Sequence, residues 1–259
     1  MNTNRLHLID TLRGLSIISM IIYHTVWIMT AFGYGLSFET INGSLCTFWE
    51  RTICMGFILI SGFSFSLGRR HLKNGLITFS LGALITLVTC LIVPDLKIIF
   101  GVLTFLGSAN LLMIPLDKLL GPKTVDPEGI TNRRFCIISS LLCIFLFIFF
   151  YKVNKGCLGI GNIFLITIPE SIRRGYFMTY LGFMMPGFRS ADYFSLLPWI
   201  FWYFLGYFLE KLSRGTDLRS ITLTKGIPAL SFLGRHSLVI YVIHPIVIFA
   251  TVFLYSVCF

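Results

Sequence analysis

The stretch IDTLRGLSIISMIIYHTVWIMTAFG, residues 9–33, decides the fold, because it is apolar and long enough to cross a lipid bilayer. It opens with Asp10 and Arg13 and, after ten intervening residues, carries His24. At about 1.5 Å of rise per residue, His24 lies roughly 16 Å above Arg13, near the middle of a hydrocarbon core roughly 30 Å thick. A second histidine, His244, is expected at a similar depth in the last apolar segment. Ionisable side chains at that depth are costly unless they face protein or water, so both are candidate functional residues.

Composition places the whole chain in a membrane. Of its 259 residues 56% are hydrophobic and 12% are charged, and the mean hydropathy is +0.84. Soluble domains carry about 25% charged residues. The chain is therefore expected to be an all-α, polytopic membrane bundle that forms a single domain over residues 1–259. Windows of about 20 apolar residues predict seven spans, at 12–33, 46–68, 75–94, 98–116, 135–151, 194–210 and 230–256.

The net charge is +10, and the distribution of lysines and arginines between the loops predicts the orientation. With a cytoplasmic N-terminus, thirteen lysines and arginines fall in inner segments and seven in outer ones. This bias follows the positive-inside rule and predicts an N-in, C-out topology. Because the rule accounts for the basic residues, nucleic acid is not expected as a partner, whereas the lipid bilayer is.

A basic cluster is predicted at the inner ends of the spans. Asp10 and Arg13 are three residues apart, and they form either a local ion pair that anchors the first helix or part of a site for an anionic group. Arginine offers a planar fork of donors that suits phosphate. The other residues expected at this level are Arg69, Arg70, Arg235 and His236.

The two histidines suggest acid–base or nucleophilic chemistry. A neutral imidazole can take a proton from a hydroxyl or an amine, or attack a carbonyl carbon itself. The alternative is that each is a packed core residue. No metal is expected, because no carboxylate or cysteine obviously completes a ligand set around the histidines. The seven cysteines show no CxxC spacing and are interpreted as small core residues.

Two acidic residues begin spans from the outer side. Glu50 and Asp192 either orient an acceptor or a histidine, or cap helices. Asp192 is the next-to-last residue of the long outer segment 152–193. Within it, GYFMTYLGFMMPGF (175–188) is apolar but too short to span, which predicts a re-entrant or interfacial segment.

A family resemblance connects these features. The opening IDTLRGLSIISMIIYHT resembles the start of the heparan-alpha-glucosaminide N-acetyltransferase catalytic-domain family, which is widespread in bacteria. The spacing of Arg13 and His24 is also similar to that of the wider acyltransferase type 3 group. Further similar segments follow in family order and extend the resemblance from residue 5 to 247: FILISGFSFSLGRR, FGVLTFLGSANLL, DYFSLLPWIFWYFLGYFL and LSFLGRHSLVIYVIHP.

The resemblance implies that an acetyl group passes from cytoplasmic acetyl-CoA, through a bacterial plasma membrane, to an outer-side sugar or cell-envelope glycan. It makes His24 the catalytic histidine and puts Arg13 at the cytoplasmic mouth. The chain departs from the family at Thr104, where many relatives have a histidine, and in having fewer spans than the lysosomal enzyme.

Two other classes of protein remain open from the residues alone. A transporter or proton-coupled carrier would use the same histidines as a relay, but the paired helix breaks of such folds are not evident. A non-catalytic membrane interaction protein would have packed histidines and no tunnel. The sequence leaves open the acceptor, the acyl chain length, the oligomeric state, and the choice between direct transfer and an acyl-histidine intermediate.

Overall fold

The computed structural model describes residues 7–35, 37–41, 43–125, 130–161, 165–217, 219 and 226–258. The chain divides into two compact units, and each is described by itself. The first unit takes the described residues of 1–60 and 215–259, and the second takes those of 61–214. A single domain over 1–259 stays a prediction.

The first unit brings the two ends of the chain together. Its apolar core lies between α1, α3 and α11, where the buried side chains of Ile17, Met20 and Ile53 pack with partly buried neighbours that include Ile240 and Tyr241. Residues far apart in sequence therefore share one core. The elements of this unit are α1 (His7–Ala31), α2 (Phe38–Ile41), most of α3 (Ser44–Phe65), α10 (Pro228–Arg235) and α11 (Ser237–Cys258).

Helices α1 and α10 approach so closely that two positions admit only glycine. A Cβ on Gly14 would lie 2.0 Å from the carbonyl oxygen of Leu230, and one on Gly234 would lie 1.9 Å from that of Asp10. Lipid tails are as apolar as the helices, so such close backbone packing, rather than the hydrophobic effect, holds helices together in a membrane. The predicted last span, 230–256, accordingly differs from the structure, where α10 is a separate short helix and α11 begins after His236.

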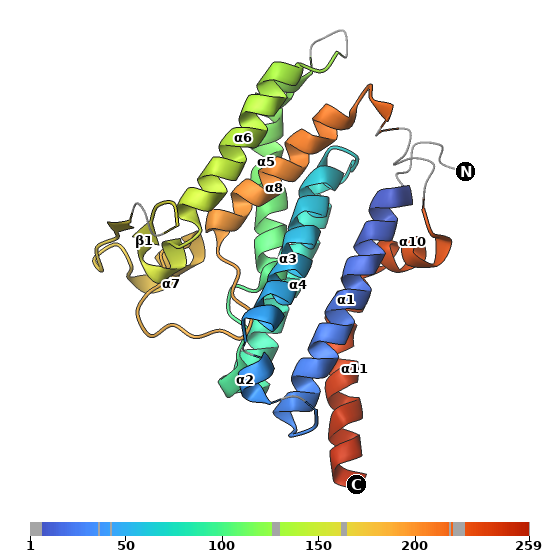
Figure 1. The fold of residues 1–259 in the computed structure, drawn as a ribbon, viewed down its shortest axis with the longest axis vertical. Coiled ribbons are helices and arrows are strands. Elements are labelled where there is room, and N and C mark those ends of the chain that lie inside the picture. Colours follow the sequence, from blue (N-terminus) through green and yellow to red (C-terminus); the bar gives the residue numbers. More distant parts are fainter. Residues whose placement is uncertain are drawn as a thin grey trace. The chain divides into compact units, whose positions relative to one another are not determined.

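Helices α1 and α11 run in the same direction (Figure 1). Phe32 contacts Phe249 with ring centroids 5.6 Å apart, and Tyr34 contacts Tyr255 at 5.5 Å, so the contacts advance along both helices together. First and last spans that are parallel require an odd number of crossings, if each span crosses once. The number of crossings and the seven-span topology stay predictions.

The second unit is built from two close helix pairs. On α4 and α5, a Cβ on Gly82 would lie 2.6 Å from Thr104 Oγ1, and α6 packs on α8 through Phe147 and Trp199, whose ring centroids are 5.5 Å apart. An antiparallel hairpin interrupts the helical architecture and pairs Cys157 with Thr167. The elements are α4 (His71–Ile92), η1 (Pro94–Leu96), α5 (Val102–Thr124), α6 (Arg133–Phe150), η2 (Val153–Lys155), β1 (Cys157–Leu158), β2 (Ile166–Thr167), α7 (Gly175–Leu181) and α8 (Leu196–Ser213).

The structure is that of an all-helical, multi-pass membrane protein, as predicted. Six of its described helices are long and apolar enough to cross a membrane, namely α1, α3, α4, α5, α11 and the stretch Arg133–Lys155 that includes α6. The predicted sixth span, 194–210, corresponds to α8 (Leu196–Ser213), whose backbone is non-helical at Leu197. It is not among the six, so its crossing of the membrane stays a prediction. Helix α7 has seven residues, too few to span, as predicted for 175–188.

The N-in, C-out topology leads to a labelling prediction. Cys258 is exposed near the end of α11, so an impermeant maleimide applied to intact cells is expected to label it. The comparison uses a protein with Cys258 as its single cysteine and an Asn2→Cys variant in which all native cysteines are serine; the latter is expected to be labelled only after permeabilisation. Equal labelling of both proteins in intact cells would place the termini on one side and contradict the topology.

Candidate functional site

The two predicted membrane histidines lie side by side in the first unit. His24 on α1 and His244 on α11 have ring centroids 5.0 Å apart and ring planes inclined by 53°. His24 is half-buried, whereas His244 is only 6% exposed. The parallel packing of the two helices brings these residues to one level. The prediction that they lie beside one another is confirmed, and their catalytic role stays a prediction.

The hydrogen bond of His244 defines where its proton sits. Its Nδ1 lies 3.1 Å from the carbonyl oxygen of Ile240, one turn earlier on α11. Since a carbonyl oxygen can only accept, Nδ1 carries the proton in this bond. The neutral ring then has its lone pair on Nε2, which is buried with no hydrogen-bond partner among the described residues. His244 thus presents an unsatisfied acceptor inside the unit, where polar atoms are usually paired.

The neighbouring Tyr23 connects the histidines to α3. Its ring contacts His24 edge-on at 5.6 Å and Trp49 at 5.5 Å, and its hydroxyl lies 3.5 Å from Glu50 Oε2. Trp49 also donates from Nε1 to Ser19 Oγ at 2.8 Å, which ties α3 to α1. Glu50 therefore belongs to the surroundings of the histidine pair. Sequence analysis missed Tyr23, although its place directly before His24 was a visible signal.

The local ion pair predicted at the start of α1 is present. Arg13 Nη1 lies 3.3 Å from Asp10 Oδ1, and the Asp10 carboxylate is buried. Because the backbones of Asp10 and Gly234 are in contact, Arg13 and Arg235 belong to the same end of the α1–α10 pair. Arg235 is exposed, with its guanidinium 5.9 Å from the ring of Phe232.

The remaining members of the predicted inner cluster are exposed. His236 Nδ1 bonds the carbonyl oxygen of Phe232 at 2.9 Å. Arg69 and Arg70 belong to the second unit, between α3 and α4. Their convergence with Arg13 therefore stays a prediction.

Asp192 has a structural task in the second unit. Its Oδ2 accepts a hydrogen bond from the backbone N–H of Val102 at 3.1 Å, so it caps α5. The sequence had suggested capping of the helix that follows Asp192, which is α8. Next to it, the Tyr193 hydroxyl donates to the carbonyl of Thr179, and burial raises the pKa of Tyr193 to about 12, so this donor keeps its proton at neutral pH. A role of Asp192 in acceptor binding stays a prediction.

Thr104 occupies a tightly packed position on α5. It is buried against Gly82, and its Oγ1 has no hydrogen-bond partner among the described residues. The carbonyl oxygen of Thr104 accepts from Ser108 Oγ at 2.7 Å. A histidine at this position would need more room than Gly82 and Ser108 leave in the present packing.

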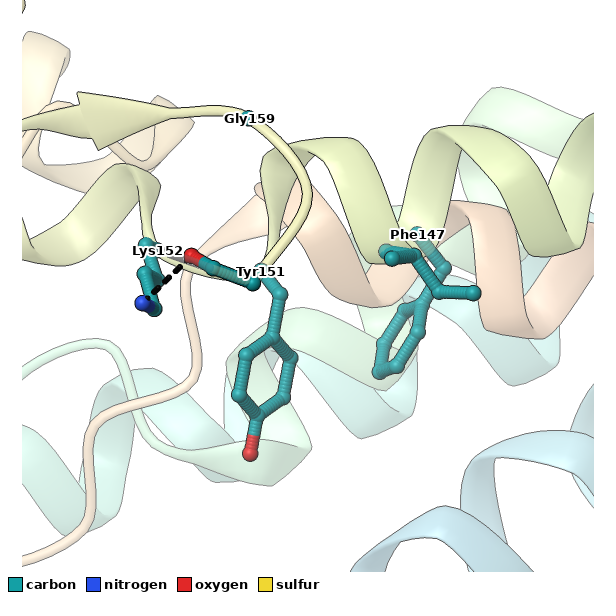
Figure 2. A pocket seen from close by; sticks show the side chains of 6 residues that line it. Phe147, Tyr151, Lys152 and Gly159 are labelled. Atoms are coloured by element: carbon teal, nitrogen blue, oxygen red, sulfur yellow. Dashed lines mark hydrogen bonds between the residues drawn. The ribbon is translucent and has the colours of Figure 1, made fainter. Parts of the chain in front are cut away.

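Two further expectations concern the surroundings of the site. In the described part of the chain, no three His, Cys, Asp or Glu side chains are grouped as a metal site requires. A pocket is present in the second unit, at the end of α6, and none of the predicted site residues lines it (Figure 2). The polar tunnel expected beside the histidines stays a prediction.

Comparison with known proteins gives one clear result. The family model described as "Heparan-alpha-glucosaminide N-acetyltransferase, catalytic" matches residues 5–125 and 134–246. The match includes both histidines and all of the predicted inner cluster. Comparison with curated proteins and with solved structures gave no match.

Proposed function

Because this chain belongs to the heparan-alpha-glucosaminide N-acetyltransferase catalytic family, we propose that it moves an acetyl group from acetyl-CoA on the inner side to an acceptor on the outer side. Membership implies a membrane acetyltransferase, and the family uses acetyl-CoA. The proposed acceptor is a hydroxyl or amine of a sugar or cell-envelope glycan. The observation that carries the proposal is the contact of His24 with His244 on parallel first and last helices.

The proposed chemistry needs an unprotonated nitrogen on His24. In direct transfer, His24 takes the proton from the acceptor O–H or N–H as the acceptor attacks the thioester carbonyl carbon. The C–S bond then breaks, and the CoA thiolate leaves and takes up a proton. In the alternative, His24 attacks that carbon first and carries the acetyl group as an acyl-imidazole until the acceptor displaces it.

His244 is proposed to act on His24 rather than on the thioester. A nitrogen that has a lone pair cannot donate to the carbonyl oxygen of the thioester, but it can accept the N–H of a neighbouring ring. Since Nδ1 of His244 is held by the Ile240 carbonyl, its Nε2 is suited to accept from His24. This bond would place the lone pair of His24 on the opposite nitrogen, toward the reactants. His244 is therefore a positioning residue in this proposal.

The two ends of the site have separate tasks. At the inner end, the guanidinium groups are proposed to bind the CoA phosphates, assisted by Asp10, which orients Arg13, and by His236. At the outer end, Glu50 acts through Tyr23, and Asp192 lies beside the acceptor. The phosphate-binding residues proposed are Arg13, Arg69, Arg70 and Arg235.

Binding of acetyl-CoA tests this function most directly. A charge-assisted contact with phosphate contributes about 1.5–3 kcal/mol, so Arg13→Ala is expected to weaken acetyl-CoA binding roughly ten- to a hundredfold. Isothermal titration of the purified protein measures the change. Arg174→Ala, which removes an exposed charge from the predicted outer segment, is the matched control and is expected to bind like the wild type.

Thermal unfolding of the same proteins separates binding from folding. Because the Asp10 carboxylate is buried and loses its partner, Arg13→Ala is expected to lower the melting temperature, so binding is compared at a temperature at which both proteins are folded. Unchanged binding would remove Arg13 from the site. A wild-type protein that binds no acetyl-CoA would overturn the proposed enzyme function itself.

A further inference from the structure

The turn between α3 and α4 carries an aromatic pair that belongs to the second unit. The imidazole of His71, the first residue of α4, stacks on the ring of Phe65, with centroids 4.0 Å apart and ring planes inclined by 23°. Phe65 is only 4% exposed, and the ring of Tyr207 on α8 contacts it edge-on at 6.3 Å. The packing of Phe65 against α8 therefore supports His71 from one side.

The imidazole of His71 retains groups that can contact a ligand. It is half-buried, and among the described residues no second ring contacts it and neither of its nitrogens has a hydrogen-bond partner. Gly68 adds no side chain over the Cε1 edge of the ring, where a Cβ would lie 3.0 Å from that atom. The ring is thus held by Phe65 and keeps its polar edge unused.

Three cations flank this ring, with Arg69 and Arg70 directly before it and Lys73 two residues after it. All three are exposed, and none has an ion pair or a side-chain hydrogen bond with any residue that the structure describes. Consecutive Cα atoms are about 3.8 Å apart, so the guanidinium groups originate close to the imidazole. The positive-inside rule accounts for the cations of a predicted inner turn, but not for the stacked aromatic pair beside them. A ligand that matches both features has a flat ring and negative charges.

We propose that His71 stacks on the adenine of acetyl-CoA while Arg69 and Arg70 bind the phosphates of the same nucleotide. This inference rests on the proposed function and adds to it the residue that recognises the base. Every nucleobase has a π face that can stack on an aromatic side chain, whereas free phosphate or a lipid headgroup would use the cations alone. Because Phe65 supports the imidazole before the ligand binds, little ordering of this side chain is needed.

Isothermal titration of the full-length protein with adenosine 3′,5′-bisphosphate, the adenine end of CoA, tests the proposal. Loss of one base–aromatic stack weakens binding about five- to a hundredfold, so His71→Ala is expected to lose this much affinity for the bisphosphate and for acetyl-CoA. His71→Phe keeps a ring on Phe65 and is expected to bind both ligands like the wild type. The matched control is Leu72→Ala, which shortens an exposed neighbouring side chain and is expected to leave both affinities unchanged.

Three results of the titration would overturn the proposal. The first is unchanged affinity of His71→Ala for the bisphosphate. The second is an equal loss in His71→Phe and His71→Ala, which would show that the ring face is not what binds. The third is a wild-type protein that binds acetyl-CoA but not the bisphosphate, since the adenine end would then contribute nothing to binding.

A truncated acetyl donor separates recognition of the base from support of the turn. S-acetylpantetheine has no nucleotide, so His71→Ala is expected to lower kcat/KM for acetyl-CoA about five- to a hundredfold and to leave kcat/KM for S-acetylpantetheine unchanged. Equal losses with the two donors would show a structural role and overturn the proposal. A wild-type protein that transfers acetyl from neither donor would overturn the proposed function instead, and the titration would still decide whether His71 binds the base.

Discussion

His24→Ala is expected to fold and to bind acetyl-CoA like the wild type, yet to lose acetyl transfer. Loss of a general base costs 10²–10⁴-fold in rate, and loss of an obligate nucleophile abolishes turnover. Transfer of a labelled acetyl group from acetyl-CoA to an amino-sugar acceptor, measured in proteoliposomes, gives the rate. The matched control is His7→Ala, because His7 is exposed at the start of the same helix and belongs to no predicted site.

The same assay distinguishes the two proposed mechanisms. Without acceptor, an acyl-imidazole mechanism is expected to leave label on the wild-type protein and none on His24→Ala. Direct transfer leaves both proteins unlabelled. Wild-type transfer by His24→Ala would refute both mechanisms.

His244→Ala is expected to lower kcat on the order of 10²-fold, toward the lower end of the range for acid–base groups, with the KM for acetyl-CoA unchanged. Without the acceptor at Nε2, the His24 ring loses the partner proposed to orient it. His244→Gln keeps a side-chain carbonyl as an acceptor and is expected to recover part of the rate. Steady-state kinetics of both variants provide the measurement.

A merely structural role for His244 predicts another pattern. Both substitutions would then lower the melting temperature, and kcat would follow the fraction of folded protein with no advantage for glutamine. A rise in the KM for acetyl-CoA instead of a fall in kcat would place His244 in donor binding. Either result would refute the positioning role.

Much of the helical architecture could be predicted from residues alone. Bilayer thickness converts an apolar run of about 20 residues into a span, so the predicted 12–33, 46–68 and 135–151 lie within a few residues of α1, α3 and α6. The expected depth of His24 in the membrane followed from the helical rise of about 1.5 Å per residue. The sequence could predict these features because each depends only on one segment and on the lipid bilayer around it.

Other features depend on contacts between segments that are remote in sequence, and local sequence patterns could not predict them. The break at His236 follows from the backbone contact of Gly234 with Asp10, more than two hundred residues away. Asp192 caps α5 rather than the helix that follows it, because the loop before α8 returns to the start of α5. Each partner is remote in sequence, so neither spacing nor composition could identify it.

The sequence by itself determined a membrane bundle with two histidines at one depth, because hydropathy and helical rise are local properties. Only the tertiary structure decided that α1 and α11 pack in parallel with those rings 5.0 Å apart, and that Tyr23 lies between His24 and Glu50. It also decided which nitrogen of His244 lacks a hydrogen-bond partner: Nδ1 bonds the carbonyl oxygen of Ile240, and Nε2 has no partner among the described residues. A side chain's depth follows from its own helix, whereas its partners follow from close packing between helices.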